Sequence, residues 1–267
     1  MARNQGLYAY GVIGEQPQPF FTITGIDKAS NVYPIAGKDI CVIVSEIDID
    51  IFQNQVKSLL SGLTGSTDDA PGGAEAILQA HEDVVGALME STTVVPFTFG
   101  TILKDEAAAA TLLVDGEAKF KRLLAKFAGR AEWGVKVYAD NQRFLQYALA
   151  SESKNSVAAN VSQGTAYLLG KKLEEETKEY AAIQLANIGE YIFQELVKYA
   201  YEGMLNKTLP QKLTGKKHEM VLNTAFLVEK ENVARFCKQE KILREKYAPM
   251  GLELEISGPW AAYSFTS

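Results

Sequence analysis

The sequence is poor in the residues that build metal centres and disulfide frameworks. It has two cysteines, Cys41 and Cys237, and two histidines, His81 and His218, among 267 residues. Neither histidine has a cysteine or a second histidine at ligand spacing, which argues against a Cys/His zinc site. The cysteines lie in opposite halves, one in an apolar run and one on a helical apolar stripe. We interpret them as free thiols of a reducing compartment.

Further absences bear on location and on partners. No run approaches the roughly 18 consecutive apolar residues of a transmembrane helix, and Met1–Gly6 lacks the apolar core and cleavage site of a secretory signal. A net charge of −6 and a pI near 5.2 argue against a surface built to neutralise nucleic-acid phosphates. We therefore expect a soluble, cytoplasmic protein that binds neither nucleic acid nor a lipid membrane.

What is present is the composition of a globular chain, with 47% hydrophobic and 22% charged residues. Its length of 267 residues is typical of two domains. Near the midpoint, Trp133, Val135 and Val137 alternate with small or polar residues, the pattern of a strand with one buried face. We place the domain boundary at this strand, which gives domains 1–131 and 132–267.

The first half alternates strand-like and helix-like segments. The apolar run 39–45 has the pattern of a central strand covered on both faces. The helical pattern of 104–128 is interrupted at Gly116. We therefore expect an N-terminal α+β sandwich. Its predicted strands are 7–13, 39–45 and 94–101, and its predicted helices are 51–60, 74–90 and 104–128.

The second half predicts a ferredoxin-like α+β domain with a helical insertion at about 161–201. The order of strands and helices after the midpoint strand favours this fold, but the pattern leaves open whether the insertion is one helix or a hairpin. The segment 203–218 has four lysines and no acid. It predicts an exposed basic connection, with binding of an anionic partner as the alternative. The other predicted elements are helices 141–151 and 232–247 and strands 220–228 and 252–256.

His81 and the adjacent Glu82 are the residues that we considered for acid–base chemistry. His81 falls on the apolar stripe of helix 74–90, which predicts a core histidine hydrogen-bonded to a neighbour. Glu82 points away from it by about 100°. The alternative is a small-molecule enzyme or ligand-binding protein in which His81 opens onto a cavity. No nucleophile–base pair, metal cluster or phosphate loop is recognisable, so we expect no catalytic residues, metal or cofactor.

The tail 258–267 carries three aromatic residues, Trp260, Tyr263 and Phe265, after a Gly-Pro break. Each large ring contributes about 2 kcal/mol when it is buried, so a solvated tail would be costly. The tail therefore packs on its own domain or docks on a partner, and the sequence leaves both open. If it docks on a partner, its deletion should abolish binding without unfolding the chain.

The tail is also similar to the Gly-Pro-Trp-Pro-Pro-Tyr-Ser-Phe ending of the GvpF/GvpL family of gas vesicle proteins. Ala261 and Ala262 stand where that ending has prolines. Other segments resemble the family in the same order along the chain, so the resemblance covers nearly its whole length. They are 7–11, 81–82, 94–101, 132–137, 164–169 and 222–228.

The resemblance implies a non-enzymatic protein needed to form gas vesicles, the hollow protein-walled flotation organelles of some prokaryotes. It implies an accessory or minor structural protein at the vesicle that contacts the shell protein and other vesicle accessory proteins. It also implies two α+β domains, the second a modified ferredoxin-like fold. We expect Trp260, Tyr263 and Phe265 to bind the partner, because desolvated aromatic residues carry much of the binding energy at interfaces. The two alanines make this tail less stiff than the family ending.

Overall fold

The computed structural model describes residues 4–14, 23–63, 72–152 and 163–267, with side chains omitted at 59–63, 72–75, 149–152 and 163–178. The chain divides into two compact units. The first unit combines Met1–Glu132 with Pro259–Ser267, and the second is Trp133–Gly258. These units differ from the predicted domains, 1–131 and 132–267, in the tail, because residues 259–267 make their contacts with the first unit.

The first unit contains an antiparallel sheet in the order β2-β3-β1-β4, with β5 also paired to β1. The predicted strands 7–13 and 39–45 are both present, and the second is internal, as predicted. The predicted strand 94–101 ends at Pro96, and β2 and β5 were not predicted. The strands are β1 (Gln5–Gly14), β2 (Val32–Ala36), β3 (Ile40–Asp48), β4 (Val94–Pro96) and β5 (Ile102–Leu103).

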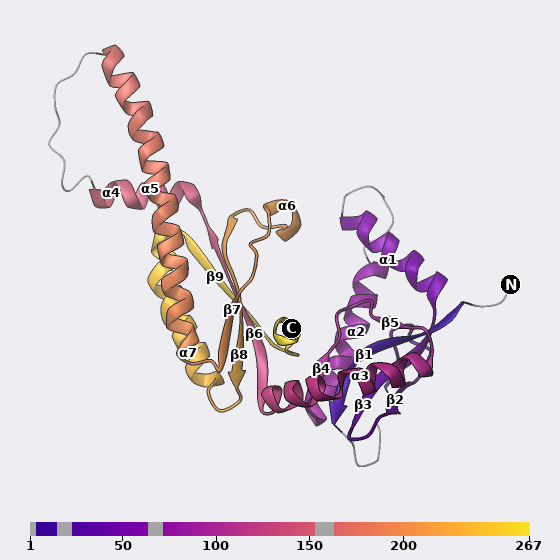
Figure 1. Ribbon diagram of the computed structural model, residues 1–267. Coiled ribbons are helices and arrows are strands. Elements are labelled where there is room, and N and C mark those ends of the chain that lie inside the picture. The colour runs from indigo at the N-terminus through magenta and orange to yellow at the C-terminus, as the bar shows by residue number, and fades with distance from the viewer. Residues whose placement is uncertain (1–3, 15–22, 64–71, 153–162) are drawn as a thin grey trace. The chain divides into compact units, whose positions relative to one another are not determined.

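Three helices accompany this sheet, α1 (Ile49–Leu63), α2 (Gly72–Ser91) and α3 (Glu106–Phe127) (Figure 1). α1 and α2 share one core cluster with Tyr8 and Tyr10 of β1. α3 contacts β1, β2, β3 and β4 through its own buried side chains. Its expected interruption is wrong, because the helix runs unbroken through Gly116.

A β-bulge in β1 decides which side chains reach the cluster under α2. The register against β3 shifts between Ala9 and Gly11, so Tyr10 is an extra residue. The extra residue shifts by one position the alternation of β1 side chains between the two faces of the sheet. Tyr8, Tyr10 and Ile13 therefore all join the same buried cluster. Gly11 is required beside the bulge, because a Cβ there would lie 2.5 Å from the carbonyl oxygen of Val95.

The second unit contains a four-stranded sheet in the order β7-β8-β6-β9. Figure 1 shows α5 and α7 side by side along one face of this sheet. The strands are β6 (Arg130–Ala139), β7 (Glu202–Leu205), β8 (Glu219–Glu229) and β9 (Leu252–Trp260). The helices are α4 (Asn141–Glu152), α5 (Gln163–Val197), α6 (Gln211–Thr214) and α7 (Val233–Tyr247), followed by the 3-10 turn η1 (Ala248–Met250).

The midpoint strand has the buried face that its alternation predicted. Val135 and Val137 of β6 have no exposed surface and pack with Ile192 of α5 and Phe236 of α7. In the predicted insertion 161–201, residues 163–197 form one helix, α5, while 161–162 lie outside the described residues. The predicted connection 203–218 was wrong in part, because it contains most of β7 and the short α6.

The fold is thus a mixture of helices with two antiparallel sheets, which is the coarse class that the sequence predicted. Cys41, which is buried, and Cys237, which is half-buried, form no disulfide. Within the described ranges, none of the helices has the length and apolar character needed to cross a membrane. The described side chains likewise form no group of three or more His, Cys, Asp or Glu residues placed to hold a metal ion.

Candidate functional site at the docked C-terminal tail

The C-terminal tail, Pro259–Ser267, folds into the core of the first unit. It follows β9 and includes a 3-10 turn, η2 (Tyr263–Phe265). Ala261 belongs to the same buried cluster as Tyr8, and Phe265 exposes only 1% of its surface. The last residues of the chain therefore complete a core that is otherwise built from its N-terminal half.

His81, on α2, holds the tail through its side chain. It has no exposed surface. Its Nδ1 atom lies 2.9 Å from the hydroxyl of Tyr8 on β1, and its Nε2 atom lies 3.0 Å from the hydroxyl of Tyr263 in the tail. Both ring nitrogens thus have partners, and the imidazole joins the first strand to the end of the chain.

A neutral His81 has one ring nitrogen that donates and one that accepts, so one of the two tyrosine hydroxyls donates to the ring and the other accepts from it. The Tyr8 oxygen also accepts from the backbone N–H of Gly100 at 3.0 Å. Both nitrogens of the buried imidazole are therefore satisfied.

Burial sets the protonation of this cluster. It lowers the pKa of His81 to about 4, so the imidazole is neutral near pH 7. It also raises the pKa of Tyr8 and of Tyr263, so both hydroxyls remain donors. For Glu82, burial raises the pKa while the hydrogen bond from Tyr263 opposes the rise. The cluster is suited to holding the tail in one position.

A second contact ties the tail to β6. Glu132, which is 9% exposed, accepts two hydrogen bonds from Ser264. The backbone N–H donates to Oε2 at 2.8 Å and the side-chain hydroxyl donates to Oε1 at 2.7 Å. Burial raises the pKa of the Glu132 carboxyl, and the bonds from Ser264 oppose that rise. We call Tyr8, His81, Glu82 and Glu132 the tail-docking site.

Several of the segments that resemble the gas vesicle family meet at this site. The segments 7–11, 81–82 and 132–137 supply its residues, the tail docks on them, and 94–101 supplies the N–H of Gly100 that binds Tyr8. Gly100 contributes its N–H from a backbone with φ +85°, a conformation that favours glycine. The sequence singled out His81 and Glu82, but it gave no sign that Tyr8, Glu132 and Ser264 would join them.

The three aromatic residues that we expected to bind a partner are in different environments. Trp260 keeps 43% of its surface exposed, whereas Phe265 is buried with the Lys126 ammonium 5.5 Å from its ring centroid. Tyr263 is half-buried and bonded to His81. Because the tail carries core residues of the first unit, its deletion cannot be expected to leave the fold unchanged.

The expectation that His81 is a core histidine is confirmed by its complete burial. The alternative hypothesis, that His81 opens onto a cavity, is wrong for the same reason. Two cavities lined by described residues lie elsewhere, one beside α1 and one in the second unit, and His81 lines neither of them.

Comparison with known proteins identifies the family. The family model described as gas vesicle synthesis protein GvpL/GvpF matches residues 6–267. The chain belongs to the GvpL/GvpF family. The resemblance inferred from the sequence is therefore confirmed, and with it a role in gas vesicle formation and a place at the gas vesicle.

The relatives in this family include both F and L proteins. Gas vesicle protein L of a Streptomyces species is 29% identical over 187 residues, which cover 70% of this chain and 67% of the relative. Gas vesicle protein F of a Nostoc species is 23% identical over 267 residues, which cover 98% of each chain.

Crystal structures of two GvpF proteins share this fold. The protein from Anabaena superposes with a TM-score of 0.68 at 22% identity and covers 98% of this chain and 96% of its own. The protein from Microcystis aeruginosa also gives 0.68 at 22% identity, covering 98% and 99%. At this identity the likeness supports the fold, a mixture of helices and two antiparallel sheets.

Proposed function

We propose that this member of the GvpL/GvpF family is an accessory or minor structural protein of gas vesicle formation that works through protein–protein contacts. Its partners are the vesicle shell protein and other vesicle accessory proteins. The observation that carries this proposal is the complete burial of His81 beneath the tail. The residues considered for acid–base chemistry hold the chain's own terminus, so the protein works as a non-enzyme through its surfaces.

Trp260 is the proposed contact residue. It is the last residue of β9, and the next residues of the tail are held by His81 and Glu132, so its exposed ring is held in place before binding. A preorganised aromatic side chain loses little conformational freedom when a partner covers it. Tyr263 and Phe265 then serve binding by positioning Trp260.

We also propose that the second unit is a modified ferredoxin-like sandwich. Its strands follow the chain as β6, β7, β8 and β9, and they lie in the sheet as β7-β8-β6-β9. This is the interleaved order of the ferredoxin-like βαββαβ unit. α4 and α5 occupy the first crossover and α7 the second, so the helical insertion lengthens the first crossover.

The test is binding of the purified chain to the vesicle shell protein, with Trp260→Ala and a control. We expect Trp260→Ala to weaken binding at least about tenfold, equivalent to about 1.4 kcal/mol, with an unchanged melting temperature. Val114→Ala is the control, because Val114 is an exposed apolar residue of the same unit (74% exposed) outside the tail. It should bind as the wild type does.

Unchanged affinity in Trp260→Ala would show that the partner contact lies elsewhere. If the folded wild-type chain bound neither the shell protein nor any accessory vesicle protein, the proposed mode of action would be wrong.

A further inference from the structure

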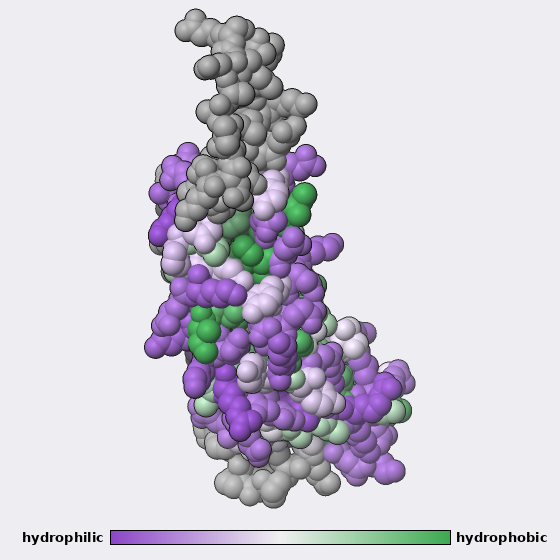
Figure 2. Space-filling model, turned by 90° about the vertical axis from the view of Figure 1, so that its left-hand side faces the viewer, coloured by the Kyte–Doolittle hydropathy of each residue, from purple (hydrophilic) through white to green (hydrophobic). Residues whose placement is uncertain are grey.

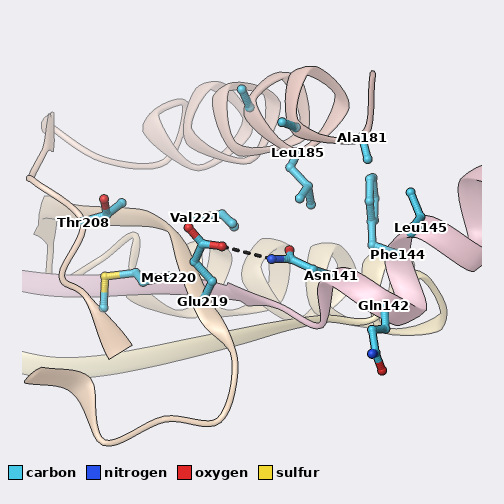
Figure 3. A pocket seen from close by; sticks show the side chains of 12 residues that line it. Asn141, Gln142, Phe144, Leu145, Ala181, Leu185, Thr208, Glu219, Met220 and Val221 are labelled. Carbon is cyan, nitrogen blue, oxygen red and sulfur yellow. Dashed lines mark hydrogen bonds between the residues drawn. The ribbon is translucent and has the colours of Figure 1, made fainter. Parts of the chain in front are cut away.

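The second unit contains a cavity of about 520 Å³ with no assigned role. This volume lies within the range of about 300–1,000 Å³ that is typical of binding sites. α4, α5 and the start of β8 enclose it, with one residue from the loop before α6 (Figure 3). We call it the α4–α5 groove. It is lined by Asn141, Gln142, Phe144, Leu145, Ala181, Ala182, Leu185, Ala186, Thr208, Glu219, Met220 and Val221.

The groove is apolar inside and has a low wall on α5. Phe144, Leu185 and Met220 are buried in its interior, while Ala182 and Ala186 on α5 are exposed. The side chains of these alanines are short, so another backbone can approach the helix closely there. Figure 2 shows hydrophobic residues gathered in a hollow on this face of the molecule, bordered by hydrophilic ones.

Carboxylates lie along one side of the groove. The exposed Glu219 accepts a hydrogen bond through Oε2 from Asn141 Nδ2 at 3.0 Å, as Figure 3 shows. Two further exposed acids on α5, Glu179 and Glu190, lie one turn before Ala182 and one turn after Ala186. The loop that leads into β8 carries exposed lysines, and Lys217 lies two residues before Glu219. The two α5 acids therefore make the α5 side the one that favours a cation.

The walls also restrict what kind of segment can enter. β8 lies between β6 and β7 in the sheet, and β7 pairs with its residues 224–227, beyond the part that lines the groove. Two of the walls are helices, α4 and α5, and most of their lining side chains are apolar. An amphipathic helix presents a row of apolar side chains at spacings of three and four residues.

We propose that the α4–α5 groove binds the apolar face of an amphipathic helix from a partner protein, and that a lysine or arginine of that helix pairs with Glu219. This inference rests on the proposed function, since it names the kind of partner through which the chain acts. It involves a surface formed entirely by the second unit.

The first experiment uses a synthetic probe in place of the natural partner. It is a labelled peptide of about 18 residues with leucines at helical spacing and lysines elsewhere, compared with a leucine–glutamate peptide of the same pattern. The wild-type chain should bind the lysine peptide and not the glutamate peptide. Ala186→Trp fills the groove and should weaken binding at least about tenfold. Glu219→Gln should weaken binding less and reduce its dependence on salt.

Ile242→Trp is the matched control, because Ile242 is an exposed residue of α7 (48% exposed) that does not line the groove. It should bind the lysine peptide as the wild type does. If Ala186→Trp lowers the melting temperature, Ala182→Lys replaces it, since this exposed residue can carry a charge without entering the core and its positive charge repels the lysine peptide. Equal binding by wild type and groove variant, or equal binding of both peptides, would overturn the proposal.

Complementation separates this inference from the function on which it rests. In cells that lack the chain, the wild type should restore gas vesicles and Ala186→Trp should not. Full restoration by a folded, groove-filled variant would overturn the groove proposal alone, whereas vesicle formation without the chain would overturn the proposed function. If the chain self-associates and Ala186→Trp abolishes this, the occupant is a second copy and the proposal is wrong.

Discussion

At the scale of single residues, His81 shows how a side chain suited to catalysis can serve structure. A neutral imidazole has one donor and one acceptor, and the two tyrosine hydroxyls on either side use both of them. Because the ring has no exposed surface, its protonation would place an uncompensated charge in the core. Neutral His81 is therefore part of the folded state.

This predicts a specific dependence of stability on pH. His81 has a folded pKa of about 4 against an ordinary value of 6.5, so between these values the unfolded chain binds a proton that the folded chain does not. Its contribution is complete above about pH 6.5 and is lost as the pH falls toward 4. The loss is roughly 3 kcal/mol. Urea unfolding at a series of pH values measures it.

His81→Gln should remove this slope and lower the free energy of unfolding at pH 8 by about 1–3 kcal/mol, since one tyrosine loses its partner. The variant should therefore approach or exceed the wild type near pH 4. Tyr8→Phe is the control, because it removes a hydrogen bond but keeps the histidine, and it should retain the slope. Parallel curves for His81→Gln and wild type would contradict a neutral, buried His81.

At the scale of elements, α3 shows why a glycine that breaks a helical pattern can belong to the helix. A Cβ at Gly116 would lie 2.4 Å from Cε2 of Phe120, whose buried ring packs edge-on against Phe97 at 6.1 Å between centroids. The glycine makes room for a ring one turn away. Glycine lowers the helix propensity at this position, but it allows the Phe120 ring to pack.

We therefore expect Gly116→Ala to destabilise the protein by about 1–2 kcal/mol, because the ring must shift within a packed core. The matched control is Gly86→Ala on α2, where a Cβ would meet no atom within 4 Å. That variant should gain up to about 1 kcal/mol from helix propensity. Opposite signs in urea denaturation support this account of α3, and a gain in both variants would contradict it.

The elements that the sequence predicted are those whose own residues carry the signal. β1 and β3 each contain an apolar run, so their burial is evident locally. β2 contains Pro34 and lies at a sheet edge, where a missing N–H is tolerated. β7 is a short strand beside a lysine-rich loop, and its pairing with β8 defines it. Such strands exist through a partner that is distant in sequence.

Dependence on partners that are distant in sequence also explains why the sequence did not predict the tail-docking site. The spacing of apolar residues in α2 predicts that His81 is buried, because the signal lies within one helix. Its partner Tyr263 is 182 residues away, and the bond depends on the tertiary fold. The aromatic tail predicted that burial or docking would occur, without indicating which surface receives it.

At the scale of the whole molecule, the chain passes between its two units twice, after Glu132 and after Gly258. The second unit is thus an insertion in a first unit whose core is completed by the last residues of the chain. The core of the first unit is complete only when Pro259–Ser267 is docked, since Ala261 and Phe265 belong to its buried interior. The first and last segments that form this one core are separated by almost the entire sequence.

Deletion of Pro259–Ser267 is therefore expected to destabilise the first unit by about 4 kcal/mol or more, because a buried phenylalanine is lost and Glu132 and His81 each lose a partner. Hydrogen exchange should show loss of protection in the amides of β1 while those of β8 remain protected. Trp260→Ala is the control, since it removes an exposed ring and should leave both strands protected. Undiminished protection of β1 in the deletion would mean that the N-terminal residues form a core without the tail.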